Sequence, residues 1–135
     1  MFIGEYTHTV DEKKRFSLPA KFRKELGKKV VVTRGKDHCL FLYPKKTWDA
    51  LSKEVQRMGH VESDPRYARF TFAGASEIEI DSIGRILVPE FLREFAELNP
   101  PAGGPIVITG VHDRVEIWND KRWSAYREKL ESEYA

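Results

Sequence analysis

Two pairs of oppositely charged residues recur at the same spacing in this sequence. Asp11 and Arg15 bracket the stretch "DEKKR", and Asp81 and Arg85 bracket the stretch "DSIGR". An aspartate can orient an arginine through a charge-assisted hydrogen bond, and an oriented arginine can bind a phosphate or the edge of a guanine. Each Asp-x-x-x-Arg motif therefore offers two roles, which are closing its own turn and presenting a guanidinium to an anionic ligand.

Further cations surround the first motif but not the second. The candidates to neutralise the phosphates of DNA, by residue type and clustering, are Lys13, Lys14, Arg15, Lys21, Arg23 and Lys24. Residues 1–48 contain 12 Lys and Arg against 5 Asp and Glu, whereas residues 71–135 contain 7 against 12. This asymmetry predicts an anionic partner for the N-terminal part of the chain, and the alternative is a solvated surface whose charges happen to segregate.

The two motifs belong to an internal repeat with an offset of 70 residues. The matched positions are Asp11 and Asp81, Arg15 and Arg85, Pro19 and Pro89, and Arg23 and Arg93. Further along, "VVVT" (30–33) matches "IVIT" (106–109), and Trp48 matches Trp123. We predict a first unit at 1–58 with its C-terminal helix, a linker or helical segment at 59–70, and a second unit with its C-terminal helix at 71–135. A unit this small cannot bury enough apolar surface alone, so we expect the two units to interleave.

The apolar pattern within each unit predicts a β-hairpin followed by a helix. Residues 6–10 and 15–19 flank the first turn, and residues 76–80 and 85–89 flank the second. Gly84 suits a left-handed turn position, where the first copy has Lys14 at some energetic cost. Further strands are expected at 30–33, 39–43, 106–109 and 115–118, and helices at 20–26, 45–58, 90–98 and 120–134.

The stretches "MFIGEYTHTVDEKKRFSLPAKFR", "CLFLYP" and "AGASEIEIDSIGRILVP" resemble the MraZ family of bacterial transcriptional regulators, and the resemblance covers nearly the whole chain. It implies a mainly β fold with peripheral α-helices, in which two tandem AbrB-like swapped-hairpin units form an interleaved pseudo-twofold β-barrel. It also implies a ring-like homo-oligomer that binds a repeated motif in double-stranded promoter DNA and represses its own division and cell-wall operon. The family has glycine before the motif arginine, which Gly84 keeps and Lys14 replaces.

Arg15 is the first candidate for contact with a base, because a two-stranded β-ribbon can enter the major groove. Arg85 is a further candidate for the DNA interface, and Asp11 and Asp81 are expected to stabilise the hairpins. The rival interpretation is that both arginines only staple their own turns. The alternative function is a ring-forming interaction scaffold whose basic end has nonspecific affinity for DNA.

Other functional classes find little support in the sequence. The four histidines and Cys39 lack the spacing of a metal site, and no nucleophile motif, phosphate loop or dinucleotide-binding pattern occurs. We therefore predict no catalytic residue, metal, cofactor or small-molecule substrate, which leaves a small hydrolase as a distant third hypothesis. The lack of a long apolar run predicts no membrane partner, and the single cysteine predicts a reducing compartment, so we expect a cytoplasmic protein. The DNA-binding role that the resemblance implies would make it nucleoid-associated.

Overall fold

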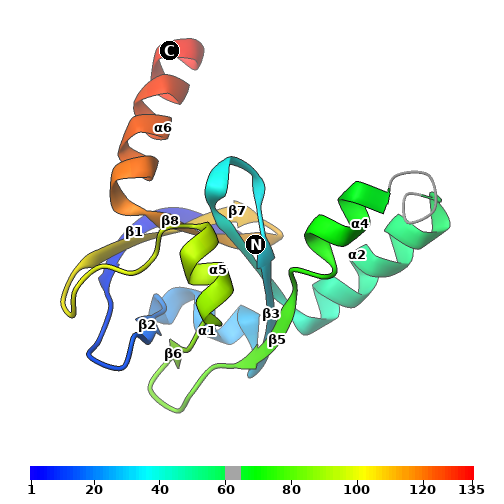
Figure 1. Ribbon diagram of the computed structural model, residues 1–135, viewed down its shortest axis with the longest axis horizontal. Helices are drawn as coiled ribbons and strands as arrows, with labels where there is room; N and C mark the ends of the chain where they lie inside the picture. The colour runs from blue at the N-terminus through cyan, green and yellow to red at the C-terminus, as the bar shows by residue number, and fades with distance from the viewer. Residues whose placement is uncertain (60–64) are drawn as a thin grey trace.

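The computed structural model describes residues 1–59 and 65–135 of the chain (Figure 1). Six strands form one antiparallel sheet in the order β1-β7-β8-β4-β3-β5. Their bounds are β1 Phe2–Thr9, β3 Lys29–Arg34, β4 Leu40–Pro44, β5 Ser76–Glu79, β7 Pro105–His112 and β8 Arg114–Asn119. Strands β2 (Phe16–Ser17) and β6 (Arg85–Ile86) form a separate two-stranded ribbon. All four further strands expected from the sequence are therefore present, each within a residue or a few of its expected bounds.

Strands from the two repeats pair directly with each other. Strand β1 pairs with β7 over its full length, β3 pairs with β5, and β2 pairs with β6. The arms of each predicted hairpin thus find their partners in the other repeat. In the first repeat a single bridge between Val10 and Phe16 closes the turn before the arms separate. This pairing gives β1 eight partnered residues, more than a simple hairpin with the short β2 could offer.

Proline residues set where the helices begin. Pro19, Pro44 and Pro89 each stand directly before a helix, and each proline has a φ near −55°. Proline lacks a backbone N–H, but a residue at this position donates no hydrogen bond within the helix, so the helix loses none. The helices are α1 Ala20–Leu26, α2 Lys45–Arg57, α4 Pro65–Thr71, α5 Glu90–Phe95 and α6 Asp120–Tyr134. The helix expected at 90–98 is three residues shorter, because Glu97 adopts a positive φ of 55° and ends it. Residues 60–64 of the expected linker lie outside the described residues.

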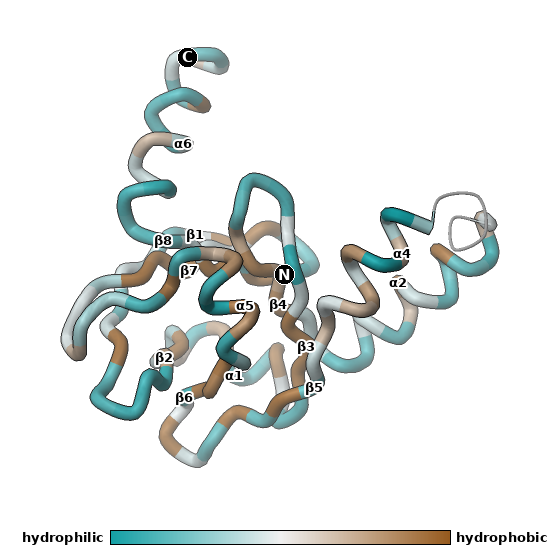
Figure 2. Tube along the Cα trace, in the orientation of Figure 1, coloured by the Kyte–Doolittle hydropathy of each residue, from teal (hydrophilic) through white to brown (hydrophobic). Residues whose placement is uncertain are grey.

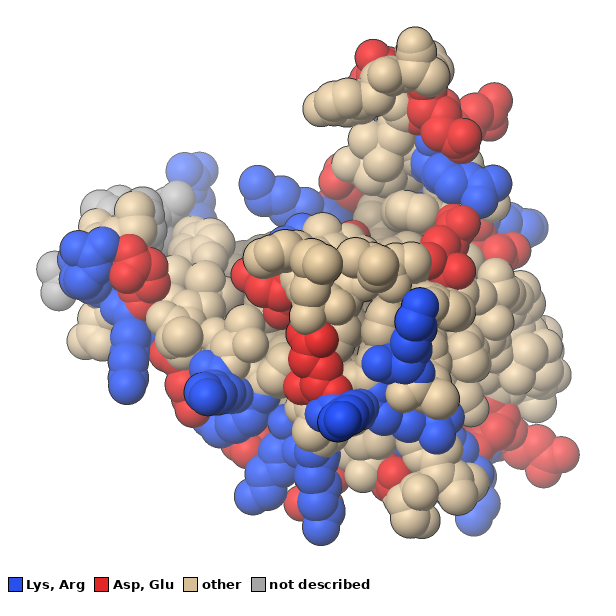
Figure 3. All heavy atoms as spheres, turned by 180° about the vertical axis from the view of Figure 1, so that it is seen from behind, with Lys and Arg blue, Asp and Glu red and all other residues tan. Residues whose placement is uncertain are grey.

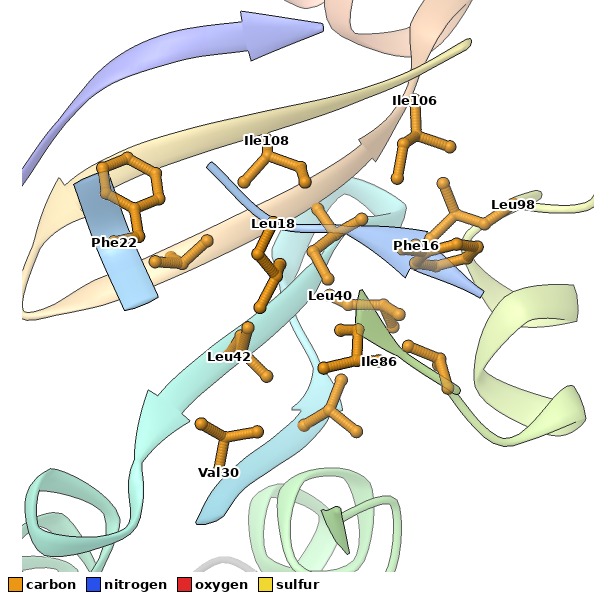
Figure 4. Close-up of a cluster of buried hydrophobic side chains, with 14 of the residues drawn as sticks. Phe16, Leu18, Phe22, Val30, Leu40, Leu42, Ile86, Leu98, Ile106 and Ile108 are labelled. Atoms are coloured by element: carbon orange, nitrogen blue, oxygen red, sulfur yellow. The ribbon is translucent and has the colours of Figure 1, made fainter. Parts of the chain in front are cut away.

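One apolar core is shared by both repeats. Figure 4 shows side chains from the first repeat, such as Phe16 and Leu18, pointing into the same interior as Ile86 and Ile106 from the second. Apolar residues concentrate on the central strands, whereas α6 and the loops are mostly hydrophilic (Figure 2). Because both repeats supply strands to the sheet and to the ribbon, the fold holds the two Asp-x-x-x-Arg turns in fixed positions relative to each other.

Two helical projections extend from this core. Helices α2 and α4 both extend from one flank of the molecule, and α6 rises from the end of β8 (Figure 1). Trp123 and Tyr126 at the base of α6 pack against Trp118 of β8, which anchors the first turns of that helix. None of the helices among the described residues is long and apolar enough to cross a membrane.

Candidate nucleic-acid interface

The two Asp-x-x-x-Arg turns have the same hydrogen-bond geometry. In the first turn, Asp11 Oδ1 accepts the backbone N–H groups of Lys13 and Arg15, each at 2.9 Å, and Asp11 Oδ2 accepts Arg15 Nε at 2.7 Å. In the second turn, Asp81 accepts the equivalent bonds from Ile83 and Arg85 at 2.8 to 3.1 Å. Each aspartate therefore closes its turn and holds its arginine.

These hydrogen bonds favour the ionised form of both carboxyl groups. The backbone N–H of Arg15 is the largest cause that lowers the pKa of Asp11 below its usual value, and the side chain of Arg15 adds to it. The backbone N–H and side chain of Arg85 lower the pKa of Asp81 in the same way. Both aspartates therefore stay ionised to a lower pH than an unperturbed aspartate.

The ribbon formed by β2 and β6 brings the two turns together. Phe16 lies opposite Ile86, and Ser17 lies opposite Arg85. This pairing places Arg85 Nη1 at 3.6 Å from Asp11 Oδ2, so the ion pairs of the two repeats touch. We refer to Asp11, Arg15, Asp81 and Arg85 as the Asp–Arg cluster. The contact between Arg85 and Asp11 arises from the fold. It could not be predicted from the spacing of residues within either motif.

The guanidinium of Arg15 is oriented but not fully used. Its side chain is 28% exposed, and Asp11 engages its Nε. Within the described part of the chain, no hydrogen bond to the terminal nitrogens Nη1 and Nη2 is formed. A guanidinium held in this way can stabilise its turn and still offer a two-pronged donor to a base edge or a phosphate. The two interpretations of Arg15 that the sequence left open are therefore compatible.

Lys14 and Gly84 occupy the same left-handed position of their turns. Their φ angles are 64° and 85°, so the first turn keeps the geometry expected for glycine although it carries a lysine. A non-glycine residue in this conformation costs roughly 1–2 kcal/mol. In exchange, the exposed side chain of Lys14 adds a cation next to Lys13 at the tip of the first turn.

Arg23 belongs to the scaffold more than to the exposed surface. Its Nε and Nη2 donate to the carbonyl oxygen of Leu18 at 3.1 and 2.9 Å. Its guanidinium also lies over Gly84, where it occupies the space that a Cβ atom would need. Arg23 thereby joins the start of α1 to the second turn. Its counterpart Arg93 is buried and donates to the carbonyl oxygen of Val88, so this scaffold role recurs in both repeats.

The four lysines predicted from the sequence are all exposed around the first turn and α1. They are Lys13, Lys14, Lys21 and Lys24. Lys28 and Lys29, which follow α1, are also exposed and extend this basic surface beyond the residues predicted from the sequence. The signal for them was present in the run "GKK" directly after the helix. Figure 3 shows Lys and Arg side chains gathered along the lower part of the molecule, where Figure 1 places α1, β6 and the two turns.

Groups suited to other chemistry are not assembled in the described residues. No group of three His, Cys, Asp or Glu side chains there is placed to hold a metal ion. Cys39 is 1% exposed, and burial raises the pKa of its thiol far above the usual value. A buried neutral thiol of this kind is a packing residue.

Comparisons with known proteins agree on one family. A family described as "MraZ: MraZ protein, putative antitoxin-like" matches residues 1–70 and again residues 71–134. A protein of Halothermothrix orenii named "Transcriptional regulator MraZ" is 47% identical over 135 residues, covering 99% of this chain and 92% of that protein. Proteins with the same name from Carboxydothermus hydrogenoformans and Syntrophomonas wolfei are 44% and 43% identical over the same shares of both chains.

Proposed function

The chain belongs to the MraZ family, and from this membership we infer that it is a DNA-binding transcriptional regulator. The observation that carries this inference further is the Asp–Arg cluster with its rim of exposed lysines. Asp11 holds Arg15 through Nε, and the Arg15 side chain is 28% exposed. No enzyme class is implied by the names of the relatives, and we propose no catalytic role.

We propose that the first turn and α1 form the main DNA surface. Lys13, Lys14, Lys21 and Lys24 are exposed there, and each lysine that neutralises a phosphate releases counterions and strengthens binding at low salt. Arg23 supports this surface through its contacts with Leu18 and Gly84. The geometry therefore favours a division between lysines that hold the backbone and an arginine that reads a base.

Arg15 is proposed to contact a guanine and Arg85 to assist it. The two-stranded ribbon of β2 and β6 is narrow enough for a major groove, and an arginine there can donate two parallel bonds to the guanine O6 and N7 atoms. Arg85 lies within ion-pair reach of Asp11, so it also helps to hold the carboxylate that orients Arg15.

The finer features of assembly and regulation also belong to this proposal. We propose a ring-like homo-oligomer that binds repeated motifs upstream of its own division and cell-wall operon and represses it from the cytoplasm, in association with the nucleoid. Linked sites on one ring gain avidity without any new contact, because binding at one repeat raises the local concentration at the next. The matching of the family to 1–70 and 71–134 supports two units. We propose that these units, at 1–58 and 71–135 with 59–70 between them, are swapped hairpins that enclose the core as an interleaved pseudo-twofold barrel.

The test is fluorescence anisotropy with labelled duplex DNA from the region upstream of the encoding gene and a scrambled duplex, each at two salt concentrations. Arg15→Lys keeps the charge beside Asp11 but loses the planar fork, so we expect it to reduce the preference for the upstream duplex about tenfold. Lys21→Ala should weaken binding to both duplexes equally and reduce the salt slope by about one.

The matched control is Arg57→Lys, which alters a similar ion pair with Glu54 on α2, away from the proposed surface. It should change neither affinity nor preference. Equal, salt-sensitive binding of the wild type to both duplexes would overturn the proposal and favour the alternative, a ring-forming scaffold with nonspecific DNA affinity.

A further inference from the structure

The internal repeat is broken at two exposed positions beside the Asp–Arg cluster. Where the first copy has Lys13 and Ser17, the second copy has Ile83 and Leu87. Both apolar side chains face solvent, with Ile83 56% and Leu87 55% exposed. Exposing two large apolar side chains is unfavourable in water, so this part of the surface is suited to contact with a partner that carries apolar groups.

The two residues lie on either side of Arg85 in the sequence, one in the second turn and one directly after β6. Ile83 lies in the second turn, where its N–H donates to Asp81 Oδ1. Leu87 follows Ile86, which lies opposite Phe16, so the same antiparallel register places Leu87 opposite Arg15. Side chains directly opposite each other on a ribbon are about 5 Å apart at their Cβ atoms. A ligand that contacts the Arg15 side chain is therefore also within reach of the Leu87 side chain.

We propose that Ile83 and Leu87 contact the C5-methyl groups of thymines in the major groove, next to the base pair that Arg15 reads. This inference rests on the proposed function, since it takes the ribbon as the DNA-reading element. The thymine methyl is the apolar group that base pairs display in the major groove, and it distinguishes an A·T pair from a G·C pair. The two apolar side chains would thus add A·T preference beside a guanine.

The charges of the second copy support base contact rather than phosphate contact on its side. Exposed Glu90 and Glu94 on α5 stand where the first copy has Ala20 and Lys24 on α1. Carboxylates repel the phosphates of DNA, so the second copy is poorly suited to binding the DNA backbone. The first copy supplies the cations that position the duplex, and the second copy supplies apolar atoms to read it. A protein partner is the competing occupant of this surface, and the experiment below separates the two.

The test removes single methyl groups from the DNA. Each thymine of the upstream duplex is replaced in turn by deoxyuridine, which pairs with adenine equally well but lacks the C5-methyl group. We expect one or two replacements to weaken wild-type binding by about fourfold each, the effect of burying one such carbon. Ile83→Ala or Leu87→Ala should weaken binding to the unmodified duplex and remove the response to deoxyuridine at one position.

Ile3→Ala is the matched control, because Ile3 is also 56% exposed but lies at the far end of β1. This variant should keep the wild-type response to deoxyuridine. Wild-type affinity that is unchanged by every replacement would overturn the thymine contact while leaving the proposed function intact. If Ile83→Ala or Leu87→Ala keeps the wild-type response to deoxyuridine but forms a smaller oligomer in light scattering, the surface contacts protein and not DNA. A wild type that does not prefer the upstream duplex would overturn both proposals.

Discussion

At the scale of single residues, Lys14 and Gly84 show how one backbone conformation serves two purposes. Both lie at the left-handed position of an Asp-x-x-x-Arg turn, yet only Lys14 carries a side chain there. At the second turn the guanidinium of Arg23 fills the space above the glycine. In the first copy, the left-handed position carries local strain and a lysine side chain. In the second copy, the absence of a side chain at Gly84 leaves room for Arg23 of α1.

Exchanging these two residues should separate stability from DNA affinity. We expect Lys14→Gly to leave the free energy of unfolding within about 1 kcal/mol of the wild type, because relief of the left-handed strain offsets the extra freedom of glycine when unfolded. The same variant should bind DNA more weakly and with a smaller salt slope. Gly84→Lys should destabilise the fold by roughly 2 kcal/mol or more, because it adds strain and displaces Arg23 from Leu18. Urea unfolding and anisotropy measure the two effects, and a strongly destabilised Lys14→Gly would contradict this account.

At the scale of elements, local chemistry made the helices and turns predictable and left the strand partners undetermined. Pro19 and Pro89 fix the start of α1 and α5, and α1 has the bounds expected from its sequence. The end of α5 was predicted wrongly, because the residue with positive φ that ends the helix is Glu97 and not a glycine, which would have marked the helix end in the sequence. The pairing of β1 with β7 joins segments about a hundred residues apart, and hydrophobic alternation gives the face of a strand but not its neighbour. The contact of Arg85 with Asp11 follows from that pairing and was equally hidden.

The two turns should make stability depend on pH in the acid range. Hydrogen bonds and the arginines lower the pKa of Asp11 and Asp81 in the folded protein, so the folded state binds protons less readily than the unfolded state. Their contribution to stability is complete above the unfolded-state pKa of about 3.9 and is lost as the pH falls through the lower folded-state values. We expect the double variant Asp11→Asn, Asp81→Asn to be less stable than the wild type at pH 6 and to differ much less at pH 2.5. Asp113→Asn, on the β7–β8 turn, is the control, and a constant difference between wild type and double variant at both pH values would argue against the turns as the source.

At the scale of the whole molecule, the two repeats form a single structural unit. Each repeat contributes strands to the common sheet, one strand to the ribbon, and side chains to one core. In the folded chain, β1, β2 and β3 of the first repeat each pair with a strand of the second repeat. The periodicity of each repeat indicates apolar strand faces, whereas the common burial of those faces depends on strand pairing between the two repeats.

Cutting the chain between the halves should therefore test their interdependence. We expect a fragment of residues 1–59 and a fragment of residues 65–135 to be unfolded when separate and to regain the β-sheet signal in circular dichroism when mixed. The intact chain should unfold in one cooperative transition, because β1, β3 and β2 all lose their partners together. Two separate transitions, or a fragment that folds alone, would show that the repeats are independent domains.

The pairing of β1 with β7 also has a consequence during synthesis on the ribosome. Strand β1 ends at Thr9 and its partner begins at Pro105, so at roughly 5–20 residues per second the nascent chain waits roughly 5–20 s before β1 can pair. Throughout that interval an eight-residue strand and half of an apolar core stay without their partners, which is the condition under which chains on one polysome associate wrongly. We therefore expect the nascent first half to engage holding chaperones, and we expect slower translation between Thr9 and Pro105 to lower the yield of folded protein.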